Sequence, residues 1–387
     1  DGVAHRLRLP EKSVQEVARL SPWAAEVCGC YVDGLRQHLP GRLRTFSMSF
    51  EPTVESLLSG FMLSSFLGLA EGQERAERAF ITAMAHGAVA PHRSHSGHAL
   101  LAADPHLAVG QIPSLFFEAR ARVGERWWMG ATIPGLPGVA VGRTDCLAFS
   151  GTFSVADNAD LFPIVRLEDA PARPVTWSRR FLGPTEELIF DAPQGPCDGE
   201  PPSFAYAWAN DEGAAASVQA FLRLVECQSA DEACDALRDA HQLALHFLIA
   251  DRQGNLRSPQ LGSLPERTQG WLGLGVASAG AGWVGRRRGA VLGEVMPHNG
   301  ALWTANEARA DAQGRPCSTL TGPPYRHRRI GELLAAQAQH DRASFQRMQL
   351  DVLSGQAARL LPGFRAAMPA GIRSAPAPAR SASTITA

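Results

Sequence analysis

The stretch that decides the fold runs from residue 97 to residue 162 and reads GHALLAADPHLAVGQIPSLFFEARARVGERWWMGATIPGLPGVAVGRTDCLAFSGTFSVADNADLF. It contains three alternating or apolar runs, at residues 99–101, 115–122 and 126–133. Turn-forming pairs separate them, namely Asp104-Pro105, Val123-Gly124 and Pro134-Gly135. Runs of this kind joined by such turns are typical of consecutive antiparallel strands. The stretch is therefore predicted to form sheet.

Helical periodicity dominates the sequence before this sheet. Residues 11–39 carry apolar side chains at spacings of three and four between Pro10 and Pro40, which predicts one helix. A second helix is expected to open at Thr53 as N-cap and a third to cover residues 73–84, with sheet from residue 88. Further helices are predicted at 214–226, 230–240 and 342–361, and a buried strand at 243–250. This mixture indicates an α+β fold.

Composition bounds the possible functions. A chain of 387 residues with 45% hydrophobic content can bury a large core in one big or two moderate domains. The net charge of −1 provides no field for collecting nucleic acid or an anionic membrane. No apolar run reaches the roughly 18 residues of a membrane span. Seven cysteines, an odd number, imply no disulfide framework, and no signal peptide is visible, so localisation stays open.

Several segments carry a resemblance to a known family. They are GHALLAADPHL (97–107), PGLPGVAVGRTD (134–145), AFSGTFSVADNADLF (148–162), LWTANE (302–307) and PYRHRRIGELL (324–334). Together they resemble the β-chain of the penicillin acylase family over the middle of a full member, about residues 9–361. The resemblance implies a four-layer αββα sandwich of the N-terminal-nucleophile hydrolases. It also implies an amidohydrolase that cuts itself and uses the newly exposed serine, whose α-amine serves as base. Members are often periplasmic or secreted.

The nucleophile position departs from that pattern. Counting back from DPHL at the family's spacing places the catalytic serine at Met84. A thioether has no ionisable proton, so it can neither attack a carbonyl nor support self-cleavage by N-to-O acyl shift. Thr82 is the nearest chemically competent substitute, but a slip of two residues in a strand moves the group by about 6 to 7 Å. Thr82 is kept as the alternative nucleophile.

Four other positions match the family in type and spacing. By the resemblance, His106 orients the nucleophile's amine, and the main-chain N–H of Phe153 forms half of the oxyanion hole. The side-chain amide of Asn306 forms the other half, and Arg326 holds that amide in place. Each also has a structural reading, since His, Asn and Arg often satisfy buried carbonyls or cap helices. An oxyanion hole without a nucleophile would still bind a carbonyl oxygen.

The resemblance also implies a structural calcium held by Asp157 and Asp160, and no cofactor for the chemistry. Carboxylates suit calcium, which needs six or more oxygen ligands. The alternative is that both aspartates cap turns. The histidines at 86, 92, 95 and 98 invite a metal reading too, but the intervening polar residues favour an exposed turn.

Three regions are expected: residues 1–83 resemble the end of the family α-chain, 84–365 form the hydrolase core, and 366–387 form a disordered Ala/Pro/Ser tail. Two functional hypotheses remain. One is hydrolysis of an N-acyl amide such as a β-lactam or acyl-homoserine lactone. The other, favoured by Met84, is an inactive homologue that binds such a ligand or acts as a structural subunit completed by a second chain supplying the missing family segments.

Overall fold

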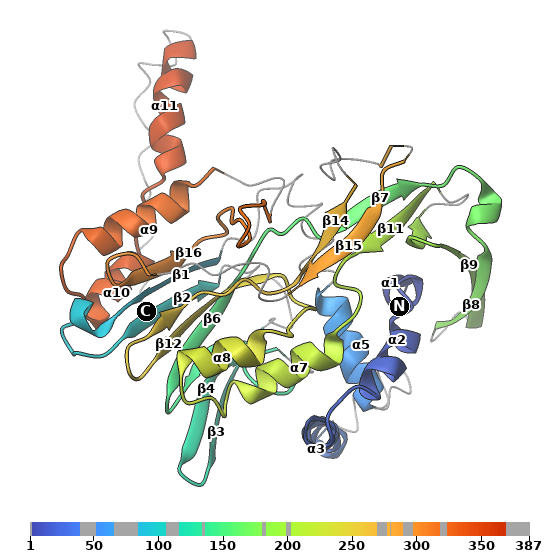
Figure 1. Ribbon diagram of the computed structural model, residues 1–387, viewed down its shortest axis with the longest axis horizontal. Coiled ribbons are helices and arrows are strands. Elements are labelled where there is room, and N and C mark those ends of the chain that lie inside the picture. The colour runs from blue at the N-terminus through green and yellow to red at the C-terminus, as the bar shows by residue number, and fades with distance from the viewer. Residues whose placement is uncertain are drawn as a thin grey trace.

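Two antiparallel sheets pack against each other in the left half of Figure 1. The computed structural model describes residues 2–38, 52–65, 84–105, 116–133, 136–179, 183–198, 203–268, 277–278, 280–288, 297–317 and 323–368. The smaller sheet has the order β16-β1-β2, with β1 at Met84–Val89, β2 at Leu100–Pro105 and β16 at Ala301–Thr304. The strand that begins at Met84 is thus central in its sheet.

The larger sheet has six strands in the order β13-β12-β6-β5-β4-β3. Their bounds are β3 Phe117–Val123, β4 Arg126–Thr132, β5 Val141–Thr144, β6 Leu147–Phe153, β12 Leu245–Asp251 and β13 Leu256–Arg257. All pairings are antiparallel. The strands β3, β4 and β6 confirm that the stretch at 97–162 forms sheet.

Strand β12 shows why this sheet is covered on both faces. Its residues Phe247 and Ile249 pack against the helical side, whereas Leu248 and Ala250 pack against the smaller sheet. Successive side chains of a strand point to opposite faces, so a continuous apolar run requires a layer on each side. The buried run predicted at 243–250 therefore belongs between two layers.

Helices complete the two outer layers. On the larger sheet lie α7 (Ala214–Arg223) and α8 (Ala230–Leu237), which share a core with Phe149 and Phe247. On the smaller sheet lie α9 (Tyr325–Ala335) and α10 (Arg342–Gln349), through Leu334 and Phe345. The order helix, sheet, sheet, helix confirms the predicted α+β, four-layer αββα sandwich (Figure 1).

The right half of Figure 1 holds a further sheet and the N-terminal helices. The five-stranded sheet has the order β7-β11-β10-β9-β8, and a two-stranded sheet pairs β14 with β15. The strand bounds are β7 Ala159–Pro163, β8 Ala172–Arg179, β9 Gly183–Ala192, β10 Gly195–Asp198, β11 Phe204–Trp208, β14 Ser263–Arg267 and β15 Trp283–Arg288. The remaining helices are α1 Gly2–Arg6, α2 Leu9–Val17, α3 Pro22–His38, α5 Val54–Ser65 and α11 Gly355–Ala367, with short 3-10 turns at Pro91–Arg93 and Leu167–Asp169.

A buried carboxylate joins the N-terminal helices to the sandwich. Glu16 of α2, with 2% of its surface exposed, accepts hydrogen bonds from the main-chain N–H groups of Gly213 and Ala215 at 3.4 and 2.8 Å. These N–H groups open α7 and have no partner within their own helix. A negative charge at a helix N-terminus is stabilising, so Glu16 caps α7 from a distant part of the sequence.

A guanidinium caps the opposite outer layer. Arg93 donates to the carbonyl oxygens of Leu334, Gln337 and Ala338 at 2.5, 2.7 and 3.0 Å. These carbonyls lie at and just beyond the C-terminal end of α9, where a positive charge is favourable. Arg93 therefore fixes α9 to the loop after β1.

Three expectations about element bounds were wrong. The helix predicted at 11–39 is two helices, because Pro22 lacks an N–H and starts α3. The run at 342–361 is also divided, since Ser354 caps α11 after a break that follows α10. The sheet begins at Met84 and not at residue 88. Across the described ranges, none of the helices has the length and apolar character needed to span a bilayer.

Candidate functional site

Strand β1 lies beside β16, the strand that leads into the Asn306 turn. Strand β1 pairs with β16 so that His86 is opposite Thr304 and Gly87 is opposite Trp303. Strand β16 ends at Thr304, and Asn306, two residues beyond it, has left the extended conformation. On its other side Met84 pairs with Pro105. The position where the family pattern expects the nucleophile therefore lies in the strand that pairs with β16, which leads into the turn of the predicted oxyanion amide.

Two partners fix the side chain of Asn306. Its Nδ2 donates to the carbonyl oxygen of Phe153 at 2.7 Å, and its Oδ1 accepts from Nη2 of Arg326 at 2.9 Å. Asn306 itself adopts a left-handed conformation with φ of 61°, which asparagine tolerates better than most residues. Arg326 lies in the first turn of α9. The structure thus brings together Phe153, Asn306 and Arg326, three of the predicted site residues.

The main chain of Phe153 faces away from β12, towards an edge of β6 that none of the described strands pairs with at this residue. The next residue, Ser154, donates its N–H to the carbonyl oxygen of Ala244 at 3.1 Å. Because main-chain groups alternate sides along a strand, the N–H and C=O of Phe153 point away from β12. Strand β5 pairs with β6 only at residues 148 and 149, so it does not reach Phe153.

Backbone strain marks the same place. Val155, two residues beyond Phe153, has φ of 49°. A β-branched residue in the left-handed region costs about 1–3 kcal/mol, and such strain clusters at functional sites. Phe153 and Val155 are both half-buried, so this edge of the sandwich is partly open to solvent.

Beneath this edge lies a buried polar layer between the two sheets, which consists of His86, Ser150, Thr152, His246 and Thr304. Each of the five is 0 or 1% exposed. His86 Nδ1 and Ser150 Oγ form a short hydrogen bond, and the hydroxyls of Thr152 and Thr304 lie 2.9 Å apart. Buried polar groups are tolerated when they pair, so this layer ties the sheets together directly below the site.

Glu307 connects the polar layer to the turn that carries Asn306. Its Oε2 accepts from the Thr304 hydroxyl at 3.0 Å and from the Ala305 N–H at 2.8 Å, and its Oε1 accepts from Arg309 Nε at 2.9 Å. Since the one hydroxyl hydrogen of Thr304 goes to Glu307, Thr152 is the donor in the threonine pair.

Arg309 is itself anchored in the core. The residue is 8% exposed, and its two other nitrogens donate to the carbonyl oxygen and the hydroxyl of Ser258, both at 3.0 Å. Hydrogen bonds from Ser258 through Arg309 to Glu307 therefore link the loop after β13 to the Asn306 turn.

The charges in this network follow from burial. Burial lowers the pKa of His246 well below its ordinary value of 6.5, and Arg309 adds to the effect, so His246 is neutral at pH 7. Burial alone would raise the pKa of Glu307, but the positive charge of Arg309 and main-chain N–H donors outweigh it and lower the pKa to about 2. The Asn306 turn is thus held by an ionised carboxylate.

Sequence reasoning missed Glu307, Arg309 and His246. A charged pair at 307 and 309 directly after a short apolar strand, and a lone histidine inside the apolar run at 243–250, were the available signals. Thr82 and His106, the other two predicted site residues, lie outside the described residues.

The predicted calcium ligands face an arginine. Arg267 donates from Nε to Asp160 Oδ2 at 2.9 Å and from Nη2 to Asp157 Oδ1 at 2.8 Å. Trp283 Nε1 also donates to Asp160 Oδ2, at 2.6 Å. Both lone pairs of that oxygen therefore accept hydrogen bonds, and the Arg267 guanidinium already supplies a positive charge beside the carboxylates. The residues as arranged do not fit a calcium ion.

Within the described ranges, no group of three or more His, Cys, Asp or Glu side chains gathers to hold a metal. The clustered histidines do not form one either, since His86 lies in the buried polar layer and His92 follows β1 in the turn at Pro91–Arg93.

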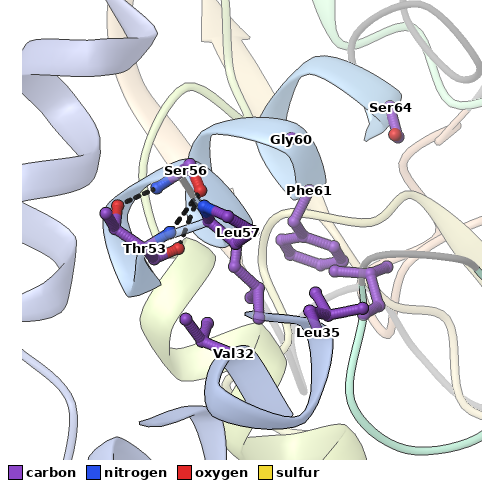
Figure 2. Close-up of a pocket in the computed structure, with 10 residues that line it drawn as sticks. Val32, Leu35, Thr53, Ser56, Leu57, Gly60, Phe61 and Ser64 are labelled. Carbon is purple, nitrogen blue, oxygen red and sulfur yellow. Dashed lines mark hydrogen bonds between the residues drawn. The ribbon is translucent and has the colours of Figure 1, made fainter. Parts of the chain in front are cut away.

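A small apolar cavity of about 160 Å³ lies between α3 and α5. Figure 2 shows Val32 and Leu35 of α3 facing Leu57 and Phe61 of α5. Leu136 also lines the cavity. Reciprocal hydrogen bonds between Thr53 and Ser56 hold the first turn of α5, as the expected N-cap role of Thr53 requires.

Most of the chain is similar to known proteins. A model of the family described as penicillin amidase matches residues 85–384. The acyl-homoserine lactone acylase QuiP of Pseudomonas aeruginosa is 28% identical over 310 residues, which cover 70% of this chain and 36% of that protein. The Pseudomonas fluorescens protein of the same name is 29% identical over 316 residues, covering 72% and 37%. Penicillin acylase 2 proenzyme of a Pseudomonas species is 28% identical over 277 residues, covering 64% and 35%.

A solved structure agrees with the sandwich. The thermostable penicillin G acylase from Alcaligenes faecalis superposes with a TM-score of 0.62 at 15% identity, covering 74% of this chain and 56% of that one. This likeness supports the fold. The matched region amounts to about a third of the length of the curated relatives. Since the family model matches well over half of the residues, the chain belongs to the penicillin amidase family.

Proposed function

We propose that this chain binds an N-acyl amide, such as an acyl-homoserine lactone or a penicillin-type compound, without hydrolysing it. The relatives' names supply the ligand class, since they include acyl-homoserine lactone acylases and a penicillin acylase. The observation that supports the proposal is that Met84, a residue without a hydroxyl, begins β1, the strand that pairs with β16 just before the Asn306 turn.

The groups that would receive a carbonyl oxygen support binding. Preorganised N–H donors aimed at a carbonyl or oxyanion are the largest single contribution in acyl-transfer sites. Here the Asn306 amide is oriented by Phe153 and Arg326, and the Phe153 N–H faces the same open edge. The same donors bind a ground-state carbonyl more weakly than a tetrahedral oxyanion, so modest affinity is expected.

The missing step is nucleophilic attack. Acyl transfer needs an oxygen or sulfur nucleophile that a base can deprotonate, and a thioether offers no proton. With Met84 at the family's nucleophile position, the ligand's carbonyl is held but not attacked. The alternative is an active amidohydrolase in which Thr82 becomes the N-terminal nucleophile, and the experiment below separates the two.

The test combines intact mass with binding and product analysis. The purified chain is incubated with a series of N-acyl homoserine lactones and with a penicillin-type amide; binding is followed by calorimetry and released acid by mass spectrometry. The proposal expects one species of 41.4 kDa, saturable binding and no released acid. Released acid together with fragments that break just before Thr82 would overturn it.

Variants locate the binding site. Asn306→Ala removes an amide that donates to the carbonyl, so affinity should fall about tenfold, equivalent to one hydrogen bond of roughly 1.4 kcal/mol. Asn299→Ala, in an exposed loop, is the matched control and should bind as the unmodified chain does. Equal affinity in both variants would place the ligand elsewhere. Met84→Ser restores the oxygen, and self-cleavage before residue 84 in that variant would locate the nucleophile position directly.

A further inference from the structure

We propose that Arg267 is a built-in cation that replaces a metal ion at the Asp157–Asp160 loop, so that this loop is ordered without calcium. The inference concerns a site separate from acyl-amide binding and holds whether or not the chain hydrolyses its ligand. It rests on the way one guanidinium and one indole fill the oxygen positions of two carboxylates.

Nitrogen donors contact three of the four carboxylate oxygens of Asp157 and Asp160. Asp160 has a side chain 0% exposed, and its two oxygens accept from Arg267 Nε at 2.9 Å, Arg267 Nη2 at 3.2 Å and Trp283 Nε1 at 2.6 Å. Arg267 Nη2 also contacts Asp157 Oδ1 at 2.8 Å and donates to the Asp157 carbonyl oxygen at 3.3 Å. The fork of a guanidinium matches paired carboxylates in a way that a point charge does not.

Calcium would have to displace these donors. It requires six to eight oxygens at about 2.3–2.6 Å. In the present arrangement the lone pairs of Asp160 Oδ2 point at two N–H groups, and an ion at that place would lie against the guanidinium. Like charges in a buried site repel strongly because the effective dielectric constant is low. The guanidinium and the ion are therefore alternatives.

A strand irregularity aims both donors at the same carboxylate. Arg267 ends β14 and Trp283 begins β15, and these strands pair Glu266 with Gly285 but Arg267 with Trp283. The register shift leaves Val284 as an extra residue, 71% exposed. A bulge of this kind re-aims side chains, and here it sets Arg267 and Trp283 directly opposite one another over Asp160.

The held loop leads straight from the candidate site. Residues 154–158, which include Asp157, connect β6, which ends at Phe153, with β7, whose second residue is Asp160. The loop includes the strained Val155, and strain persists only where surrounding contacts over-determine the backbone. The Arg267 contacts at both aspartates supply that constraint. Order in the main chain beyond Phe153 thus depends on an arginine of this chain.

The first experiment needs no variant. Thermal unfolding of the chain is measured after extensive dialysis, with excess chelator and with millimolar calcium chloride. The midpoint should move by less than about 1 °C between the three conditions, because a ligand that does not bind the native state does not stabilise it. A midpoint that falls with chelator and rises with calcium would overturn the proposal.

The second experiment reports on the site itself. A terbium ion bound between these carboxylates would lie beside Trp283 and would emit when that indole is excited, and calcium would displace it. The unmodified chain should show no such emission. Arg267→Ala should lose several degrees of thermal midpoint and gain terbium emission that calcium suppresses. Combining it with Trp283→Phe should abolish the gain and so assign the emission to this site.

Two controls keep the result decisive. Arg166→Ala removes an arginine from an exposed ion pair with Glu168 and should change neither the midpoint nor the emission. Should Arg267→Ala not fold, Arg267→Lys keeps the charge without the fork and is expected to unfold at a lower midpoint, still without terbium emission. Calcium-sensitive emission from the unmodified chain, or an Arg267→Ala variant as stable as it and equally silent, would refute the replacement.

Discussion

Replacing Glu307 by glutamine tests whether an ionised carboxylate holds the turn of the candidate site. Glutamine has the same shape and keeps one oxygen, so the change removes charge with little change in volume. Glu307 now accepts hydrogen bonds from Thr304, Ala305 and Arg309 at 2.8–3.0 Å. An amide has one acceptor oxygen, and its NH2 group would face a donor. At least one of these bonds must be lost.

The expected magnitude follows from burial. The Arg309 side chain is 5% exposed and would keep its charge without its carboxylate partner. Removing one member of a buried ion pair costs about 3–5 kcal/mol. The lowered pKa of Glu307, from 4.5 to about 2, reflects the same contact with Arg309 and corresponds to about 3 kcal/mol at neutral pH. Both routes predict that Glu307→Gln lowers the free energy of unfolding by about 3 kcal/mol.

The assay is urea unfolding at pH 7, followed by tryptophan fluorescence. The matched control is Glu187→Gln, which breaks the ion pair between Arg6 and Glu187 in which both side chains are at least 40% exposed. An exposed pair contributes about 0–1 kcal/mol, so this control should unfold nearly as the unmodified chain does. A Glu307→Gln variant within 1 kcal/mol of the control would refute the reasoning.

Acid adds a second readout with a definite sign. A carboxylate whose folded pKa is depressed stabilises the protein above its unfolded pKa, and this stability disappears as the pH falls from about 4.5 towards 2. Burial keeps His246 neutral in the folded protein, so the free energy of unfolding also falls as the pH drops below 6.5 and the unfolded chain binds a proton there. Stability of the unmodified chain should therefore decline from pH 6.5 downwards. In Glu307→Gln the part of the decline below pH 4.5 should be smaller, and an identical slope would contradict the assignment.

Three further changes probe the scaffold. Gly130→Ala would place a Cβ 2.2 Å from the carbonyl oxygen of Val141 on the paired strand, so we expect the free energy of unfolding in urea to fall by more than about 3 kcal/mol. The control Gly34→Ala, in an open helical position, should be neutral or stabilising by up to about 1 kcal/mol. Glu16→Gln removes the charge that caps α7 and should cost about 1–2 kcal/mol in the same assay; no loss would mean that the cap is dispensable. Arg93→Ala should speed amide hydrogen exchange in the last turn of α9 with little change in β12, and unchanged exchange there would exclude its role as a cap.

Local patterns in the sequence predicted much of the fold. The apolar run at 243–250 and the alternating runs of the opening stretch are strands because their periodicity requires a layer on one or both faces. The family resemblance supplied the order of the layers. Pro22 was the clearest missed signal, since a proline inside a helical pattern ends or starts a helix. The helical expectation failed there because periodicity alone continues across such a break.

The site was less accessible from sequence because it depends on long-range register. Asn306 and position 84 are separated by more than two hundred residues, and no local pattern states that β1 pairs with β16. The roles of Phe153, Asn306 and Arg326 came from motif spacing, and the hydrogen bonds now place the three together. Glu307 and Arg309 escaped notice because a charged pair usually marks solvent-exposed surface. Only the fold shows that this pair is buried.

The frame formed by Phe153, Asn306 and Arg326 can persist for a physical reason that does not require catalysis. Asn306 holds Phe153 and Arg326, and its turn is anchored through Glu307 and Arg309 into the core, so changing these residues costs stability. A nucleophile at the first residue of a strand contributes chemistry but no such network, so the fold can lose it at little cost. A family member can therefore keep an oxyanion frame after losing its serine. Under the proposed function, the frame supports carbonyl binding and the residue at position 84 decides whether an amide is cut.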